Sequence, residues 1–186
     1  MATTERITTA AELLRATSPG RCELVRGDLV MMTPLGFEHG RIAARVAVRL
    51  GTFVEEHRLG VVTGAETGFQ IAQDPDTVRA PDVGFVRADR VAATPTRAFF
   101  QGPPDLAVEV LSPNDRAGEL LAKVHDWLEA GCVAVWVVDP QAQTIAVYRA
   151  RSPMLVYRSG DTIEEADLLP DFRLPVADVF ALWPGA

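Results

Sequence analysis

The stretch that decides the fold is PDLAVEVL at residues 104–111, together with VAVWVV at residues 133–138. Both runs are mostly apolar, which is typical of strands that are buried on both faces of a sheet. The segment between them predicts a helix that runs to about Ala130, with Gly131 as its stop signal. A strand, a helix and a second strand in this order predict an α/β domain with this unit at its centre.

The flanking segments predict further helices and strands on both sides of this unit. Residues 8–16 predict a short helix, and the apolar runs that flank Arg26-Gly27-Asp28 predict a hairpin. A long helix is expected from about residue 38 to residue 57, because apolar side chains recur there at helical spacing. The remaining expected elements are an interrupted strand at 60–72, strands at 80–86, 144–148 and 154–157, and a last helix at 176–182. This pattern predicts a mixed β-sheet flanked by helices.

Size and composition limit the classes of protein to which this sequence can belong. With 186 residues, of which 48% are hydrophobic, the chain suits a single domain that spans residues 1–186. No stretch approaches the roughly 18 consecutive apolar residues of a membrane helix, so no membrane association is expected. Two isolated cysteines, Cys22 and Cys132, form neither a disulfide framework nor a zinc knuckle. The simplest expectation is a cytoplasmic protein with two reduced thiols.

The net charge of −7 argues against a protein that coats nucleic acid by electrostatic attraction alone. It does not exclude a nuclease, because acidic residues that hold a metal add negative charge where the substrate is cut, and the metal reverses the local field. Arg41, Arg45 and Arg49 form a stripe on the long predicted helix. This stripe is either a solvated face offset by Glu55 and Glu56 or a surface that follows a DNA backbone.

Three acidic residues lie in apolar segments, where an unpaired charge is costly. Glu109 lies inside the strand at 104–111, Asp82 lies near the start of the strand at 80–86, and Glu23 begins a shorter apolar run. Two carboxylates from neighbouring strands can converge on a hard cation such as Mg²⁺, which prefers oxygen ligands. The alternatives are that an arginine or backbone groups neutralise Glu109, and that Asp82 makes a turn or caps a backbone group.

The order of these residues resembles a known group of nucleases. Asp82, then Glu109 in a hydrophobic strand, then Lys123 on the following helix are similar to the pattern of the PD-(D/E)XK nuclease superfamily. More closely, the chain resembles the Uma-type family of restriction endonucleases from about residue 8 to residue 182. The matching landmarks are Glu23-Leu24-Val25 with Gly27, His39, Arg79-Ala80-Pro81-Asp82-Val83, residues 104–113, Lys123, Gly131 and Trp136-Val137-Val138-Asp139-Pro140. The resemblance implies a restriction-endonuclease-like α/β fold.

One position departs from the superfamily pattern, which places a lysine two residues after the glutamate so that both point to the same face of one strand. This sequence has Leu111 in that place. The resemblance implies that the lysine has moved to the following helix, where Lys123 occupies the matching position. A helical lysine is otherwise most often exposed to solvent, which is the alternative interpretation of Lys123.

The resemblance also implies a catalytic mechanism. Asp82 and Glu109, with the backbone carbonyl of Val110, would hold Mg²⁺ or Mn²⁺, which lowers the pKa of a bound water and stabilises charge that develops on the phosphate. Lys123 would orient the attacking water or help to deprotonate it. The implied substrate is DNA, and a homodimer would allow both strands to be cut.

Two further residues have less specific roles in this mechanism. Glu23 would bind a second metal or orient Lys123, and His39 would contact a phosphate or act in proton transfer. The alternative for His39 is a helix cap or a packing residue. For the whole protein, the main alternative is a non-catalytic nucleic-acid-binding or protein-interaction module that keeps the nuclease fold. A metal-dependent hydrolase that acts on another phosphoester is the third interpretation.

Overall fold

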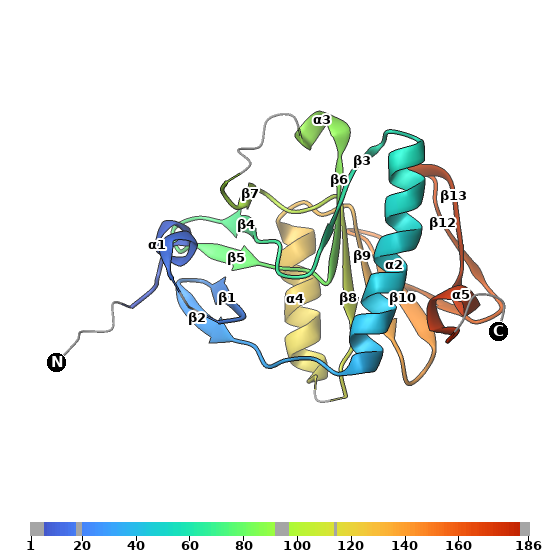
Figure 1. The fold of residues 1–186 in the computed structure, drawn as a ribbon, viewed down its shortest axis with the longest axis horizontal. Helices are drawn as coiled ribbons and strands as arrows, with labels where there is room; N and C mark the ends of the chain where they lie inside the picture. The colour runs from blue at the N-terminus through green and yellow to red at the C-terminus, as the bar shows by residue number, and fades with distance from the viewer. Residues whose placement is uncertain (1–5, 18–19, 92–96, 114, 183–186) are drawn as a thin grey trace.

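The computed structural model describes residues 6–17, 20–91, 97–113 and 115–182. Its centre is a six-stranded sheet with helices on both faces (Figure 1). In spatial order, the strands of this central sheet are β11 (Leu155–Arg158), β10 (Thr144–Tyr148), β9 (Ala134–Asp139), β8 (Leu106–Val110), β6 (Val83–Arg87) and β3 (Gly60–Gly64). Strands β8 and β9 pair in parallel, and the other neighbours pair antiparallel. The structure confirms the predicted mixed sheet flanked by helices.

Two long helices cover the two faces of the central sheet. Helix α2 (Phe37–Glu56) packs its apolar stripe against Val108 and Val110 of β8. Helix α4 (Ala117–Glu129), which connects β8 to β9, packs Trp127 on the other face, where Ala107 lies. Because successive side chains of a strand point to opposite faces, this alternation puts Glu109 on the α4 face of the sheet.

Smaller units flank this core on both sides. The N-terminal sheet comprises β2 (Asp28–Met31), β1 (Cys22–Val25), β5 (Thr77–Arg79), β4 (Phe69–Ala72) and β7 (Phe100–Gln101). With helix α1 (Ala10–Arg15), it lies on the side of α4, whereas the hairpin of β12 (Thr162–Glu165) and β13 (Leu169–Pro175) lies beyond α2 (Figure 1). Two short helices complete the chain, α3 (Ala88–Val91) after β6 and α5 (Val176–Phe180) after β13.

The chain at residues 60–72 does not form the single interrupted strand that the pattern predicts. Strand β3 belongs to the central sheet and β4 to the N-terminal sheet, so the chain changes sheets between them. Glu66 lies in this connection with φ of 68°, a left-handed conformation that ends an extended strand. A Cβ at Gly68 would lie 2.4 Å from the ring of Phe99, so a larger residue would clash there. The hairpin β12–β13 is a second element that the sequence patterns did not predict.

The arginine stripe of α2 also requires a correction, because its guanidinium groups hold helix α5. Four carbonyl oxygens and one carboxylate in and after α5 accept hydrogen bonds from the stripe. The bonds are Arg41 to Ala181 O (2.9 Å) and Phe180 O (3.3 Å), Arg45 to Asp178 O (3.0 Å) and Leu182 O (3.2 Å), and Arg49 to Asp178 Oδ2 (2.9 Å). The last carbonyls of a helix lack intrahelical donors, and these arginines supply them. The stripe is therefore neither a merely solvated face nor a set of free cations for a DNA backbone.

Two further observations concern the cysteines and the length of the helices. Both cysteines are free, with Cys132 buried and Cys22 half-buried. Burial raises the pKa of Cys132 to about 12, which keeps this thiol protonated. No helix in the described ranges has the length and apolar character needed to cross a membrane.

We expect Arg45→Ala to lower the free energy of unfolding by about 1–3 kcal/mol, because two carbonyls near the end of α5 lose charged donors. Urea denaturation measures the loss, and hydrogen exchange of the α5 amides shows where the fold loosens. Arg116→Ala is the control, since its pair with Glu119 is exposed and contributes little. An Arg45 variant as stable as this control would contradict the role assigned to the stripe.

Candidate active site

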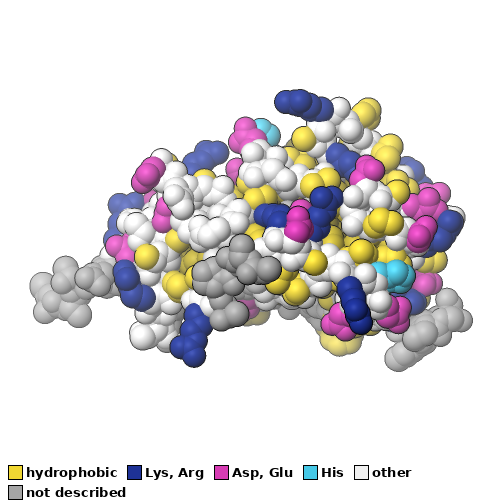
Figure 2. All heavy atoms as spheres, turned by 90° about the horizontal axis from the view of Figure 1, so that it is seen from above, with side chains coloured by type: hydrophobic (Ala, Val, Ile, Leu, Met, Phe, Trp, Pro, Cys, Tyr) yellow, Lys and Arg dark blue, Asp and Glu magenta, His cyan; other side chains and the backbone are white. Residues whose placement is uncertain are grey.

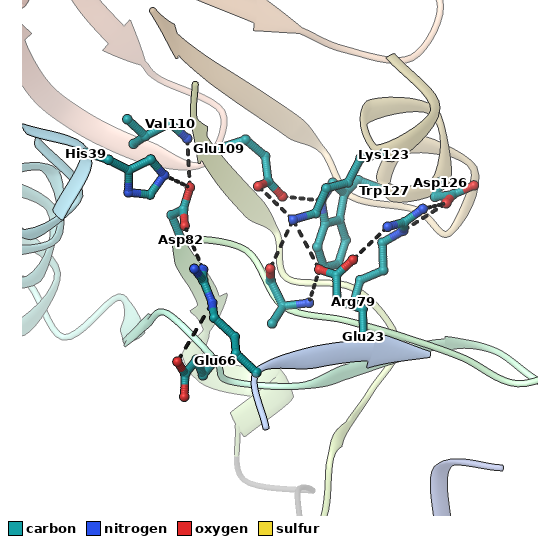
Figure 3. Close-up of polar contacts among 12 residues, drawn as sticks. Glu23, His39, Glu66, Arg79, Asp82, Glu109, Val110, Lys123, Asp126 and Trp127 are labelled. Atoms are coloured by element: carbon teal, nitrogen blue, oxygen red, sulfur yellow. Dashed lines mark hydrogen bonds and ion pairs between the residues drawn. The ribbon is translucent and has the colours of Figure 1, made fainter. Parts of the chain in front are cut away.

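The two carboxylates predicted to form the site lie on adjacent strands of the central sheet. Strands β6 and β8 pair Val83 with Val108 and Gly84 with Ala107; Asp82 directly precedes the first of these pairs and Glu109 directly follows it. The Asp82 N–H donates to the carbonyl of Val108 at 3.0 Å, one residue out of that register, so Asp82 is bonded to β8 next to Glu109. Both side chains are buried, and in Figure 3 Glu109 points toward Lys123 of α4 while Asp82 points toward His39 of α2.

Glu109 is held by two residues one turn apart on α4. Its Oε2 accepts from Lys123 Nζ at 2.9 Å, and its Oε1 accepts from Trp127 Nε1 at 2.8 Å. Burial raises the pKa of Glu109, the Lys123 ammonium lowers it and the charge of Asp82 raises it, and together these effects bring it to about 7. The hydrogen-bond partners of Glu109 are therefore a lysine and an indole N–H, and not the arginine or backbone groups of the alternative interpretation.

Lys123 is largely buried, with 15% of its side chain exposed, and its ammonium has three oxygen neighbours. Its Nζ lies 2.9 Å from Glu109 Oε2, 3.1 Å from Glu23 Oε1 and 3.2 Å from the carbonyl of Ala80. Burial would lower the pKa of Lys123, but the charges of Glu109 and Glu23 outweigh it and raise that pKa above its ordinary value. The side chain is thus a protonated ammonium inside the protein, which excludes the solvated interpretation.

Glu23 links this ammonium to an arginine of the N-terminal sheet. Its Oε1 also accepts from the Ala80 N–H at 3.0 Å, and its Oε2 accepts from Arg79 Nη1 at 2.8 Å. Burial opposes ionisation of Glu23, but the charges of Lys123 and Arg79 and the Ala80 N–H lower its pKa. Arg79 also donates two hydrogen bonds to Asp126 Oδ2 of α4, from Nε at 2.8 Å and from Nη2 at 2.5 Å. Glu23 therefore lies within a continuous ion-pair network between two layers of the fold.

Asp82 uses its two carboxylate oxygens unequally. Its Oδ2 accepts from the Val110 N–H at 2.8 Å and lies 3.1 Å from Nε2 of His39, in the first turn of α2. Its Oδ1 faces the guanidinium of Arg21 at 3.7 Å. Burial would raise the pKa of Asp82, but the hydrogen bond and charge of His39 and the Val110 N–H lower it. His39 is therefore bound to a site carboxylate.

All five side chains predicted for the site line one cavity. This cavity has a volume of about 410 Å³, and Val110 also lines it. The predicted residues that meet there are Glu23, His39, Asp82, Glu109 and Lys123 (Figure 3). Arg79, Asp126 and Trp127 also contact these residues; the sequence analysis gave none of them a role in the site, although Arg79 stands among the family landmarks. For Lys123 itself the sequence offers one further signal, because it is the only lysine in the sequence.

The donor set suits a magnesium ion that keeps most of its water. Across the described residues, no group of three or more His, Cys, Asp or Glu side chains is arranged to hold a metal. Asp82 and Glu109 remain as two hard oxygen donors that line one cavity, with Asp82 Oδ1 free of any short hydrogen bond to a described residue. Mg²⁺ is usually bound by one or two carboxylates together with waters and substrate phosphate, which fits this pair.

Comparison with known proteins gives a family and a fold. The family Uma2, described as "Putative restriction endonuclease", matches residues 10–177. A solved structure described as "a putative nuclease belonging to DUF820 from Anabaena variabilis ATCC 29413" superposes with a TM-score of 0.79. It is 20% identical in sequence, and the match covers 92% of this chain and 97% of that one, which shows that the two share a fold. No curated protein matches the sequence.

We expect Lys123→Met to destabilise the protein more at pH 8 than at pH 5. Without the ammonium, Glu109 and Glu23 have no shared counter-charge, so their pKa values in the folded state rise above those in the unfolded state. The folded state then binds more protons, so its stability falls as the pH rises. At pH 8 the loss should be about 3–5 kcal/mol, the usual cost of breaking a buried pair.

Urea denaturation in EDTA at the two pH values measures this difference. Arg26→Met is the matched control, because it removes one positive charge from an exposed side chain near Asp126. A Lys123 variant whose loss of stability is the same at both pH values would contradict the assignment of Lys123 as the counter-ion.

Proposed function

Because this chain belongs to the Uma2 family, we propose that it is a metal-dependent endonuclease that hydrolyses DNA phosphodiester bonds. The observation that carries the proposal is the buried Lys123 ammonium, which lies between two carboxylates in the cavity that also holds Asp82. A charged group buried in this way at a cavity is typical of a functional site. We also propose that residues 1–186 form one domain and that two copies act together, since a two-fold pair can cut both strands.

In this proposal, Asp82 and Glu109, with the carbonyl of Val110, hold Mg²⁺ or Mn²⁺. When bound, the metal supplies a water of lowered pKa and offsets negative charge that develops on the phosphate. Glu109 must be ionised to serve as a ligand. Since burial raises its pKa to about 7 in the free protein, a cation bound beside it would favour the ionised form. The Trp127 indole and the Lys123 ammonium fix the direction of its two oxygens.

The geometry favours a positioning and electrostatic role for Lys123 over that of a general base. Its raised pKa and its three acceptors keep it protonated, so it has no lone pair with which to remove a proton. A fixed positive charge at this place instead stabilises negative charge on a phosphate as the bond breaks. Glu23 orients Lys123, because both of its oxygens already have partners and leave little capacity for a second metal. His39 holds Asp82 Oδ2 in place.

A second candidate function is a non-catalytic module that keeps the nuclease fold. The observation that favours it is that Glu109 and Lys123 are fully paired within the protein, as in a purely structural network. On the face shown in Figure 2, basic and acidic side chains are interspersed and form no continuous basic surface. This face therefore does not favour a module that binds nucleic acid by electrostatic attraction alone.

We expect the protein to nick supercoiled plasmid DNA in Mg²⁺ or Mn²⁺, and Glu109→Gln to lower the rate by about 10²-fold or more. Glutamine keeps the side-chain volume but cannot supply an anionic ligand. Glu129→Gln, an exposed change at the end of α4, is the matched control and should cut at the normal rate. A wild-type protein that never nicks DNA would favour the non-catalytic module, and nicking that survives Glu109→Gln would contradict the site.

We also expect Mn²⁺ to raise the stability of the protein through Asp82. A ligand at 100 times its dissociation constant adds about 2.7 kcal/mol, which thermal denaturation in Mn²⁺ and in EDTA can detect. Asp82→Asn should abolish this gain, because the neutral amide is a weak ligand for a hard dication. Asp28→Asn, on an exposed residue of β2, should retain it. An unchanged gain in the Asp82 variant would show that the metal binds elsewhere.

A further inference from the structure

One cationic side chain at the cavity has only long contacts with its neighbours. Arg21 lies just before β1 and lines the cavity that holds Asp82. Its guanidinium lies 3.7 Å from Asp82 Oδ1 through Nη2, 3.7 Å from Glu66 Oε1 through Nε, and 3.5 Å from the Thr33 carbonyl through Nη1. By contrast, Arg79 makes contacts of 2.8, 2.8 and 2.5 Å. Arg21 therefore holds its neighbours loosely.

The other cationic groups of this cavity have little capacity to bind a substrate anion. Lys123 has an acceptor for each of its three N–H groups, and Arg79 is committed to Glu23 and Asp126. Among the described arginine and lysine side chains that line the cavity, Arg21 is the one whose N–H groups make no short bonds. A guanidinium is a planar fork that matches two phosphate oxygens, which makes such an arginine suited to a phosphodiester.

Asp82 Oδ1, which faces Arg21, is also the oxygen that remains for a cation. Since Oδ2 already accepts from Val110 and lies against His39, a dication at Asp82 would use Oδ1 and would repel the guanidinium. The side chain has space to move, because Arg21 also lines an adjacent cavity of about 240 Å³. The side chain is partly exposed, at 21%, so it can reach a bound DNA strand.

We propose that Arg21 is a substrate-binding residue that exchanges partners during the reaction. In the free protein its guanidinium neutralises Asp82 Oδ1; with metal and DNA bound, it turns to the non-bridging oxygens of the scissile phosphate. This assignment rests on the proposed nuclease function. It predicts that loss of Arg21 has opposite effects on two ligands: metal alone binds more tightly, and DNA binds more weakly.

The test measures both ligands in separate experiments. Calorimetry with Mn²⁺ in the absence of DNA measures the metal, and anisotropy of a short fluorescent duplex in Ca²⁺ measures DNA. For Arg21→Gln we expect Mn²⁺ to bind about tenfold more tightly, because a nearby positive charge is removed, and DNA about tenfold more weakly, because a charge-assisted bond is lost. Arg26→Gln, which makes the same charge change at an exposed side chain, should shift each affinity less than about twofold by comparison.

A second variant separates charge from shape. Arg21→Lys keeps the positive charge and loses the fork, so Mn²⁺ affinity should stay near the wild-type value while DNA affinity falls. This variant decides the question if circular dichroism shows that Arg21→Gln is unfolded, and unchanged DNA affinity in it would then overturn the proposal.

The remaining outcomes distinguish this assignment from the proposed function. Weaker Mn²⁺ binding in a folded Arg21→Gln variant would show that Arg21 supports the acidic pair structurally, which overturns the proposal. Normal Mn²⁺ binding by the wild-type protein, with both affinities unchanged by Arg21→Gln, would overturn the role of Arg21 and leave the nuclease proposal intact. A wild-type protein that binds no Mn²⁺ would overturn both.

Discussion

The site depends on one ammonium group that is buried among carboxylates. Removing a charge from water is costly, and Lys123 offsets this cost only because Glu109, Glu23 and the Ala80 carbonyl accept all three of its N–H groups. The dependence is mutual, since the two buried glutamates need the same positive charge. Glu109 illustrates how finely this balance is set: its pKa is raised to about 7 even with the lysine in contact.

The fold assembles this network where three layers meet. The central sheet supplies Asp82 and Glu109, α4 supplies Lys123, and the first turn of α2 supplies His39. The N-terminal sheet lies to one side of the central sheet in Figure 1, and it supplies Glu23, whose carboxylate contacts Lys123 of α4. Each group stands on or next to a regular element whose own packing fixes it, which is the condition for a preorganised site.

Tight pairing and reactivity place opposite demands on such a site. Groups that are satisfied by one another must exchange partners before they can act on a metal or a phosphate. Asp82 is where the structure eases this conflict, because Oδ2 is firmly held while Oδ1 faces only the distant guanidinium of Arg21 among the described residues. The two proposals therefore converge on the same oxygen, one as a metal ligand and the other as the resting partner of an arginine.

The sequence by itself determined the centre of the fold and the acidic half of the site. The mostly apolar run at residues 104–111 predicts a buried strand, and a carboxylate inside it is costly enough to mark Glu109 without any structure. Only the tertiary structure decided which distant groups pair with one another. It joins Glu23 to Arg79, 56 residues away, and Arg79 to Asp126, and it places α5 where the arginines of α2 bind it. The physical reason is that side-chain periodicity is a local property of the chain, whereas the partner of a charged group depends on which distant segment packs against it.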